Sequence, residues 1–243
     1  MRKGQPVVGD AFGTALWYQY HGGAMDEIIE SSSGCIFVTR NGVRDYFQKS
    51  DKWERSERMA LQSATGSVLD IGCGAGQHSL YLQELGHQVH AMDTSWLATE
   101  VSRLRGVKNI DCRPIEKAYE LPPKCFDTVL LLGNGLGLLG NVRKARRILR
   151  CLWRCTTDTA VIIASSCEAK AMGRDMLEKM GERDLPGQFN MRIRCNDLAT
   201  PWMEWWFISP TQLEELLVGT KWNIQKLYTG KNGRFSVVLN KGK

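Results

Sequence analysis

The sequence contains no apolar run long enough to cross a lipid bilayer. Its longest apolar stretch, residues 129–139, is interrupted by three glycines and an asparagine, whereas a membrane-spanning helix needs about 20 consecutive apolar residues. The first residues also lack the apolar segment and small-residue cleavage site of a secretory signal. We therefore expect no transmembrane helix, no membrane partner and a cytoplasmic location.

Paired cysteines are missing as well. The eight cysteines are dispersed without a Cys-x-x-Cys pair, and a reducing compartment keeps such thiols free. Cys151 and Cys155 are spaced to share a helical face, but no further pair of Cys or His lies nearby in the sequence to complete a zinc site. We expect neither a disulfide framework nor a metal.

Repeats, low-complexity tracts and long Gly/Pro-rich linkers are absent too. With 43% hydrophobic and 24% charged residues, the composition is that of a folded globular protein. A chain of 243 residues exceeds a typical domain, but one α/β domain with additions reaches this length. We expect one main domain.

The positive charge is concentrated in one segment. The formal net charge is +6, and six basic residues within residues 143–154 interleave with apolar residues at helical spacing. This pattern predicts an amphipathic helix with a basic outer face. A solvated face explains it more simply than a nucleic-acid footprint, because no aromatic residues alternate with the charges as stacking platforms.

Strand-like and helix-like runs alternate through the middle of the chain, which is typical of an α/β fold with a doubly wound, mostly parallel sheet. A pair of later runs, separated by a turn with two glycines, predicts an antiparallel C-terminal hairpin that completes a seven-stranded sheet. The candidate strands are residues 67–71, 88–92, 109–113, 127–132, 159–164, 222–228 and 234–240.

Two segments fall outside this alternation. Residues 1–65 hold too many aromatic side chains for a disordered tail, and we expect an N-terminal helical cap there. Residues 167–208, after the fifth strand, read as an insertion with possible antiparallel strands at 190–195 and 203–209. We expect residues 66–243 to form the main domain and the insertion to act as a second cap.

A glycine-rich turn follows the first predicted strand. The sequence VLDIGCGAG places Gly72, Gly74 and Gly76 between that strand and a helix-like run at 78–85. Glycines permit a tight turn and let the backbone approach a ligand closely. Asp93 stands at the end of the next strand, where a carboxylate accepts hydrogen bonds from both ribose hydroxyls. These features predict a site for a cofactor that contains adenosine.

The spacing of the glycines discriminates between cofactors of this kind. The fingerprint of a nicotinamide dinucleotide has a further glycine three residues after Gly74, and Gln77 occupies that position. Asp70, two residues before Gly72, is awkward beside a pyrophosphate but favourable beside a cationic amino group. The acid therefore favours a cofactor that carries an ammonium group.

The run VLDIGCGAGQHSLYLQELGHQVHAMDTS resembles the first two motifs of the class I S-adenosylmethionine-dependent methyltransferases, and FDTVLLLGNGLGLLG resembles the fourth-strand motif of that family. The resemblance covers residues 67–165 and, more loosely, the C-terminal hairpin. It implies a Rossmann-like fold, with S-adenosylmethionine as cofactor and S-adenosylhomocysteine as product.

The resemblance also implies roles for individual residues. The glycine turn contacts the methionine part of the cofactor, with an acid before it near the ammonium group. A second acid binds the ribose, its neighbour follows the cofactor edge, and the end of the fourth strand lies close to the transferred methyl group. In this sequence these residues are Asp70, Gly72, Cys73, Gly74, Gly76, Asp93, Thr94, Gly133 and Asn134.

Two parts of the family's pattern match less well. The acidic residue that often faces the adenine after the third strand is not apparent, and Ile115 and Glu116 stand as candidates in its place. Arg58 precedes the first strand and is a candidate for a bidentate contact with the cofactor carboxylate. The alternative for Arg58 is a solvated surface residue.

The sequence gives fewer indications of the residues that bind the methyl acceptor. An acceptor amine or hydroxyl must lose a proton, and His21 and Glu204 are the candidates for a base, with a hydrogen-bonded structural role as the alternative for each. We also expect a pocket of aromatic side chains that binds the acceptor or faces the sulfonium. The alternative is that these side chains simply pack in the core. The candidate residues for this pocket are Tyr18, Tyr20, Trp202, Trp205 and Trp206.

We predict methyl transfer to a small-molecule acceptor by a monomer or homodimer. A nucleic-acid methyltransferase is one alternative, but the fourth-strand motif lacks the Asn/Asp-Pro-Pro-aromatic signature, and no Pro-Cys dipeptide supplies a cytosine nucleophile. A cofactor-binding regulatory or partner subunit without activity is the other alternative.

Overall fold

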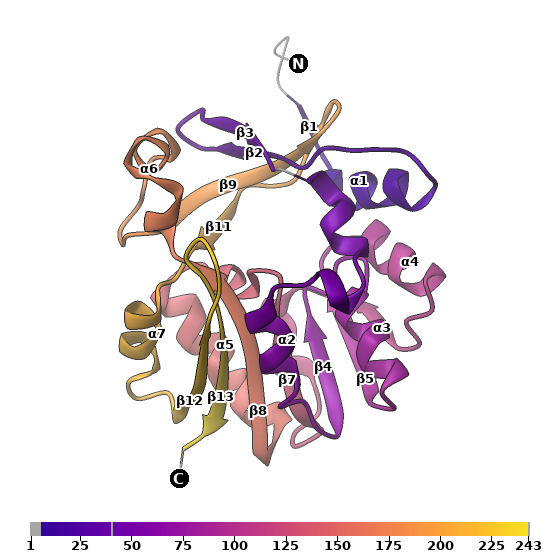
Figure 1. Cartoon of the computed structure of the whole chain (residues 1–243), viewed down its shortest axis with the longest axis vertical. Coiled ribbons are helices and arrows are strands. Elements are labelled where there is room, and N and C mark those ends of the chain that lie inside the picture. The colour runs from indigo at the N-terminus through magenta and orange to yellow at the C-terminus, as the bar shows by residue number, and fades with distance from the viewer. Residues whose placement is uncertain (1–5, 40, 243) are drawn as a thin grey trace.

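The computed structural model describes residues 6–39 and 41–242, which form two β-sheets and the helices around them (Figure 1). The larger sheet has seven strands in the order β12-β13-β8-β7-β4-β5-β6. In chain order its strands are β4 (Ser67–Ile71), β5 (Gln88–Asp93), β6 (Ile110–Cys112), β7 (Phe126–Leu131), β8 (Thr156–Cys167), β12 (Trp222–Thr229) and β13 (Arg234–Lys241).

The pairing in this sheet confirms the predicted class. β4, β5, β6, β7 and β8 pair in parallel, whereas β13 pairs antiparallel with both β8 and β12. The central strands are buried on both faces, so they read as continuous apolar runs such as Val129, Leu130 and Leu131. β8 is longer than predicted at both ends, because its last residues continue to pair with the hairpin strand β13.

Helices cover both faces of the larger sheet. They are α2 (Arg55–Leu61), α3 (Gln77–Glu84), α4 (Trp96–Leu104), α5 (Val142–Cys155) and α7 (Pro210–Leu217), with 3-10 turns η3 (Ile115–Glu120) and η4 (Gly135–Leu139) between strands. α7 begins with a capping box between Ser209 and Gln212. α5 buries Ile148, Leu149 and Leu152 and exposes its arginines, as its pattern predicted.

The second sheet is built from both segments that lie outside the alternation. Its strands run in the order β1-β10-β9-β2-β3, and β11 pairs with β9. The N-terminal segment provides β1 (Val7–Val8), β2 (Ile28–Ser31) and β3 (Ile36–Val38), and the insertion provides β9 (Gln188–Cys195), β10 (Leu198–Ala199) and β11 (Met203–Trp206). The expected helical cap thus contains α1 (Ala11–Tyr20) and α2, but also three strands that short-range periodicity did not reveal.

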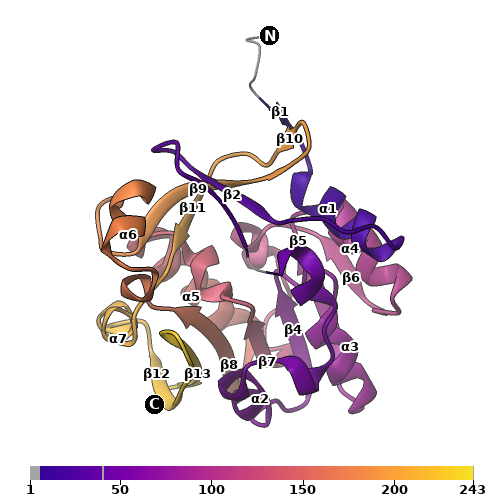
Figure 2. The same cartoon turned by 45° about the horizontal axis from the view of Figure 1, so that its top comes forward.

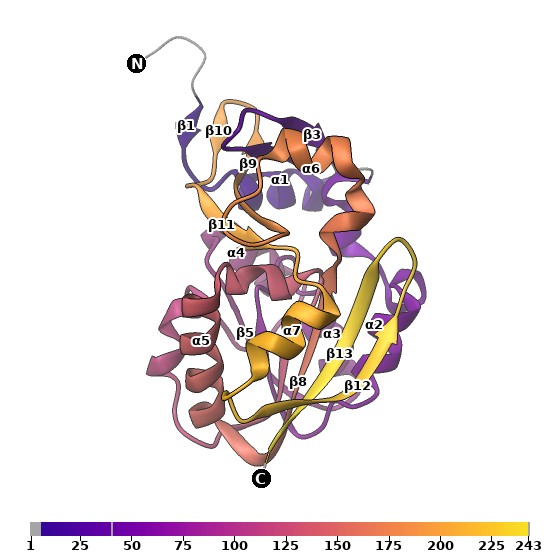
Figure 3. The ribbon, with the colours of Figure 1, turned by 90° about the vertical axis from the view of Figure 1, so that its left-hand side faces the viewer.

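The second sheet lies across one end of the larger sheet, above the carboxyl ends of its parallel strands (Figures 2 and 3). Two contacts fix its position. Cys195 of β9 packs in a buried cluster with Ala11 and Leu16 of α1. At the other side, the indole of Trp205 in β11 lies against Gly137 of η4, directly after β7. In the described part of the chain, no helix has the length and apolar character needed to cross a membrane.

Candidate active site

The glycine turn between β4 and α3 adopts a backbone that favours glycine. Gly72, Gly74 and Gly76 have φ angles of 71°, 56° and 77°, which side chains with a Cβ rarely adopt. The amides of Gly72 and Cys73 donate to the carbonyl oxygen of Met92 in β5, at 2.8 and 3.2 Å. The turn is therefore anchored to the neighbouring strand.

Asp93 ends β5 beside this turn. Its Oδ2 accepts a hydrogen bond from the Gly74 amide and its Oδ1 from the Ser95 amide, each at 2.9 Å. Burial raises the pKa of Asp93 to about 6, against the lowering effect of these two backbone hydrogen bonds. The carboxylate is thus ionised at neutral pH and has two oxygens fixed by the backbone, which suits an acceptor for hydroxyl donors.

Asp70 lies behind the turn, on the β4 side of α3. Its Oδ2 accepts a 2.6 Å hydrogen bond from the hydroxyl of Ser79, and only 2% of the residue is exposed. Burial raises its pKa, while the nearby His78 and Ser79 lower it. The Asp70 side chain is therefore enclosed between β4 and α3.

The end of β7 has an equally constrained backbone. Gly133 and Asn134 both have left-handed backbones, with φ angles of 61° and 66°. The Gly133 amide donates to Glu57 Oε1 at 2.9 Å, and the Asn134 amide donates to the Ser165 hydroxyl at 3.1 Å. The Asn134 side chain in turn accepts a hydrogen bond from the Cys167 amide at 3.0 Å. These two residues therefore present a rigid loop beside the glycine turn.

Glu57 was not among the residues predicted from sequence. Its neighbour Arg58 was, but Arg58 is exposed on α2 and forms no ion pair within the described residues, whereas Glu57 is buried. The only sequence signal for Glu57 is an acid flanked by Ser56 and Ala60 on the buried face of a short helix. Such a pattern does not identify a partner located on another strand.

The adenine-side candidates separate in the structure. Thr94 is exposed directly after Asp93. Ile115 is buried in the main core, with 7% of its surface exposed. Glu116 pairs with Lys144 of α5, with the charged atoms 2.5 Å apart. Of the pair, Ile115 is therefore fixed by packing and Glu116 is held toward α5.

The N-terminal segment covers the glycine turn from above. Tyr46 lies against Gly74, where an added Cβ would be 3.3 Å from its ring, and Phe12 packs edge-on against Tyr46 at 5.1 Å. Arg105, directly after α4, donates to the carbonyl oxygens of both Ala75 and Tyr46. These contacts were not predicted, because no local pattern links residues 12 and 46 to a turn at residue 74.

The two candidate bases do not meet. His21 follows α1, is exposed and stacks on Trp17 with ring centroids 4.5 Å apart. Glu204 lies in β11, where its Oε1 pairs with Arg183 at 2.7 Å and its Oε2 accepts from Asn141. Glu204 is therefore not presented as a free base.

The aromatic candidates also separate. Trp206 is buried in the main core, and its indole donates to the carbonyl oxygen of Pro186. Trp202 is exposed and stacks on the guanidinium of Arg192 at 4.4 Å. Trp205 faces η4, as described above. The exposed fractions of Tyr18 and Tyr20 in α1 are 50% and 37%. The five residues do not form one pocket.

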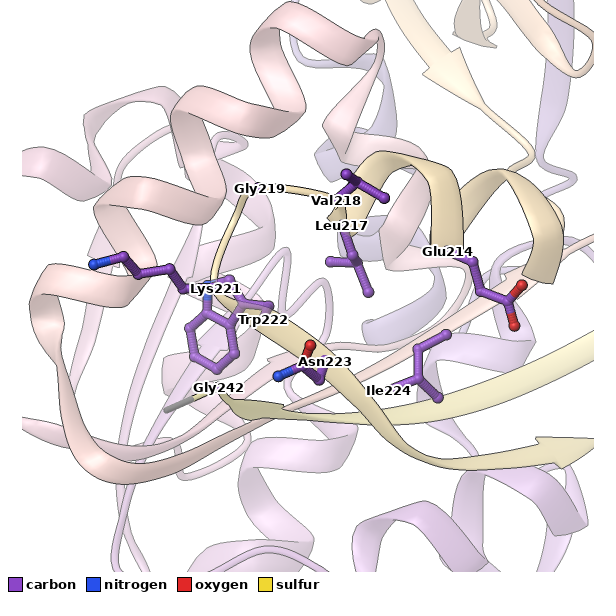
Figure 4. A pocket seen from close by; sticks show the side chains of 9 residues that line it. All are labelled: Glu214, Leu217, Val218, Gly219, Lys221, Trp222, Asn223, Ile224 and Gly242. Atoms are coloured by element: carbon purple, nitrogen blue, oxygen red, sulfur yellow. The ribbon is translucent and has the colours of Figure 1, made fainter.

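A hollow of about 450 Å³ lies between α7 and the start of β12, and Figure 4 shows its lining, which includes Glu214, Lys221 and Asn223. Trp222 pairs with Lys241 at the end of β13. Because β13 runs antiparallel to β8, this end of the hairpin lies away from the carboxyl ends of the parallel strands. The hollow is therefore remote from the glycine turn. In residues 6–39 and 41–242, no three His, Cys, Asp or Glu side chains gather as a metal site requires.

Comparison with known proteins agrees with this geometry. A family model described as a methyltransferase domain matches residues 68–159, which contain the glycine turn, Asp93 and the end of β7. A solved S-adenosylmethionine-dependent methyltransferase from Bacteroides fragilis, in complex with S-adenosyl-L-homocysteine, superposes with a TM-score of 0.82. It is 26% identical, and the match covers 96% of this chain and 95% of that one.

Residues 68–159 thus form a methyltransferase domain, and the chain has the fold of the class I S-adenosylmethionine-dependent methyltransferases. Two further structures resemble this methyltransferase in fold alone. The 1,6-didemethyltoxoflavin-N1-methyltransferase of Burkholderia thailandensis has a TM-score of 0.54 at 18% identity, covering 78% of this chain and 80% of that one. The CcbJ methyltransferase of Streptomyces caelestis has a TM-score of 0.60 at 11% identity, covering 83% and 96%. No curated protein sequence matches this methyltransferase.

Proposed function

We propose that this methyltransferase acts on a small-molecule acceptor with an apolar or aromatic surface. The observation that carries the proposal is the chemistry of one face of the second sheet. Side chains alternate between the faces of a strand, and directly opposed residues of paired strands share a face. The face shared with Cys195 and Trp205 is called the inner face. It comprises Ile29, Ser31, Phe37, Phe189, Met191, Ile193, Cys195, Leu198, Met203 and Trp205.

The inner face has no charged residue in these described strands, whereas Glu30, Arg192, Arg194 and Glu204 all lie on the opposite face. Cys195 and Trp205 are the inner-face residues that contact α1 and η4. The apolar surface is therefore turned toward the same end of the larger sheet as the glycine turn. A charge-free surface of this kind favours an acceptor with apolar area over a phosphate backbone.

The residues at the glycine turn fit the family's cofactor. The φ of Gly72 is +71°, a backbone conformation that favours glycine, and an added Cβ would also lie 2.9 Å from the end of the Leu138 side chain. Asp93 would hold the ribose, the turn with Cys73 and the Gly133–Asn134 loop would hold the methionine part, and Asp70 would balance its ammonium charge. Thr94 and Ile115 would border the adenosine. When bound, S-adenosylmethionine supplies an electrophilic methyl group for an in-line displacement.

The chain's own contribution to this chemistry is positioning. Holding the acceptor atom in near-attack geometry supplies a large share of the rate enhancement. Of the candidate bases, His21 lies at the end of α1 and Glu204 is paired on the opposite face from the apolar surface. The mechanism we propose therefore needs no protein base, and the acceptor is a group that loses its proton readily to water or reacts as a free nucleophile.

Two neighbours bear on the choice of acceptor. The Burkholderia enzyme holds 1,6-didemethyltoxoflavin together with S-adenosylhomocysteine, and the Bacteroides protein holds S-adenosyl-L-homocysteine. The first is an instance of this fold on a small heterocycle. The second supports S-adenosylmethionine as the cofactor here.

The test is transfer of a labelled methyl group. The protein is incubated with methyl-labelled S-adenosylmethionine and, in parallel, with a small-metabolite fraction, RNA and protein from the source cells. Label in the small-metabolite fraction, in a compound retained on a reversed-phase column, is the expected result. Label in RNA alone would overturn the proposed acceptor class, and binding of cofactor without label in any fraction would favour a regulatory subunit.

A further inference from the structure

Glu57 connects three elements around the candidate cofactor site. It lies in α2, and its Oε1 accepts hydrogen bonds from the Gly133 amide at the end of β7 and from the Ser165 hydroxyl in β8, at 2.9 and 3.1 Å. The Ser165 hydroxyl oxygen also accepts a hydrogen bond from the Asn134 amide. One carboxylate oxygen therefore sets the orientation of the loop that follows β7.

The other oxygen of Glu57 faces the glycine turn. Its Oε2 lies 3.7 Å from Nε2 of His78, which stands in the first turn of α3, two residues after Gly76. His78 is 5% exposed, and its Nε2 has no hydrogen-bond partner among the described residues. Trp53 covers the imidazole with ring centroids 4.5 Å apart, and its indole is held by Gln77. The pair is thus enclosed on the side away from the turn.

The surroundings shift the pKa of each member of the pair toward its charged form. Burial alone would raise the pKa of Glu57, but His78, Gly133 and Ser165 together hold it below its ordinary value. Burial alone would lower the pKa of His78, but Glu57 and the more distant Asp70 raise it above its ordinary value. Burying an ion pair costs desolvation energy, so such a pair is weak evidence for a role in stability. The position of this pair beside the candidate cofactor site therefore suggests a role other than stabilising the fold.

We propose that Glu57 and His78 form a positioning pair for the methionine end of the cofactor, so that cofactor affinity depends on both remaining charged. The inference rests on the proposed function. The two residues act on the two stretches of backbone that would grip that end: Glu57 on the Gly133–Asn134 loop, and His78 on the start of α3 behind Gly76. The two loops follow the paired strands β4 and β7, and the Glu57–His78 pair adds a side-chain connection between them.

The pair predicts a pH dependence with a definite sign. The charged groups facing His78 are Glu57 on α2 and Asp70 on β4, while Trp53 is neutral. When pH rises above the raised pKa of His78, the imidazolium loses its proton and leaves two carboxylates unpaired. The Glu57 carboxylate still accepts the Gly133 amide, but it has lost the positive charge that holds it beside α3. Affinity for S-adenosylhomocysteine therefore falls as pH rises through the raised pKa of His78.

The experiment measures binding of S-adenosylhomocysteine by calorimetry from pH 6.0 to 8.5, together with the His78 titration by NMR in the cofactor-free protein. The variants are Glu57→Gln and, as the matched control, Glu54→Gln, which lies one turn earlier and pairs only with Arg234 in the described structure. His78→Gln assigns the resonance. We expect about tenfold weaker binding at pH 7 for Glu57→Gln, a lower His78 pKa and loss of the alkaline decline, with the control unchanged.

The outcomes separate the two proposals. Wild-type protein that binds S-adenosylhomocysteine with no alkaline decline, or with a decline whose midpoint differs from the His78 pKa, overturns the positioning pair and leaves the proposed function intact. Equal binding by Glu57→Gln and wild type overturns it too. Should Glu57→Gln fail to fold, the comparison of midpoints in the wild type decides alone. Absence of binding in every protein, wild type included, would overturn the proposed function as well.

Discussion

The Asp10 carboxylate accepts a hydrogen bond from the Ser95 hydroxyl at 2.9 Å, although the two residues are 85 positions apart. The same carboxylate caps α1 through the Gly13 amide and accepts the Leu97 amide at the start of α4, each at 3.0 Å. Ser95 meanwhile caps α4 and donates its own amide to Asp93. One acid of the N-terminal segment therefore helps to position the residue proposed to bind ribose.

Replacing Asp10 tests this connection. We expect Asp10→Ala to lower the free energy of unfolding by about 2 kcal/mol, since a lost N-cap alone costs about 0.5–2 kcal/mol. We also expect weaker binding of S-adenosylhomocysteine, because Ser95 loses the partner of its hydroxyl. Urea unfolding and calorimetry measure the two effects. Asp26→Ala, at an exposed position, is the control, and equal behaviour of the two variants would contradict the prediction.

Cofactor binding is expected to depend on the protonation of Asp93. Its pKa of about 6 lies above the ordinary value of 3.8, so the carboxylate that accepts ribose hydroxyls is lost as pH falls below about 6. Affinity for S-adenosylhomocysteine should therefore decline by up to tenfold per pH unit on the acid side. Calorimetry between pH 5 and 7 measures this decline, and a flat profile would count against the role of Asp93.

The same raised pKa has the opposite effect on the cofactor-free fold. A carboxyl whose pKa is raised by folding contributes stability that is fully present below pH 3.8 and is lost as pH rises through about 6. Asp93→Asn should therefore remove this part of the pH dependence of unfolding and also weaken cofactor binding by about a hundredfold, as expected for a lost charge-assisted site. Asp158→Asn, exposed at the far end of β8, provides the comparison.

Gly76 is required for two separable reasons. A Cβ there would lie 2.7 Å from Val107 and 2.9 Å from Ser102, and the backbone φ is 77°. Gly86 has a φ of 91° with nothing within 4 Å of its Cβ position, so Gly86→Ala isolates the backbone effect. We expect Gly86→Ala to cost about 1–2 kcal/mol and Gly76→Ala about 1–3 kcal/mol more through overpacking. Equal losses in urea unfolding would show that no clash exists.

The acceptor proposal predicts different effects for two neighbouring isoleucines. Ile193 lies on the inner face of the second sheet and Ile28 on the opposite face, and both are partly buried. With the acceptor in hand, Ile193→Gln should raise the acceptor KM several-fold while leaving the affinity for S-adenosylhomocysteine unchanged. Ile28→Gln should change neither quantity. An acceptor KM that responds to Ile28 and not to Ile193 would place the acceptor elsewhere.

Local patterns predicted the site only where strand and turn were adjacent in sequence. Gly72, Gly74 and Asp93 belong to one β-turn-α-β unit, so their spacing fixes their proximity, and the structure brings Gly74 and Asp93 within hydrogen-bond distance. Glu57 and Tyr46 contact the same region, but from segments whose position depends on long-range packing. Trp202, Trp205 and Trp206 are close in sequence but do not lie together in the structure. Strand alternation points Trp205 and Trp206 to opposite faces, Trp206 packs in the main core, and Trp202 stacks on Arg192.

The sequence by itself determined the seven-stranded α/β fold, the glycine turn and the position of Asp93 beside that turn. Each of these depends on short-range periodicity and on backbone conformations that only certain residues adopt. The tertiary structure decided how residues 6–39 and 188–206 combine into a second sheet, which of its faces is free of charge, and that Glu57 meets His78. Strand pairing joins residues more than a hundred positions apart, and Glu57 and His78 lie on two different helices, so no local propensity encodes which partner will be found.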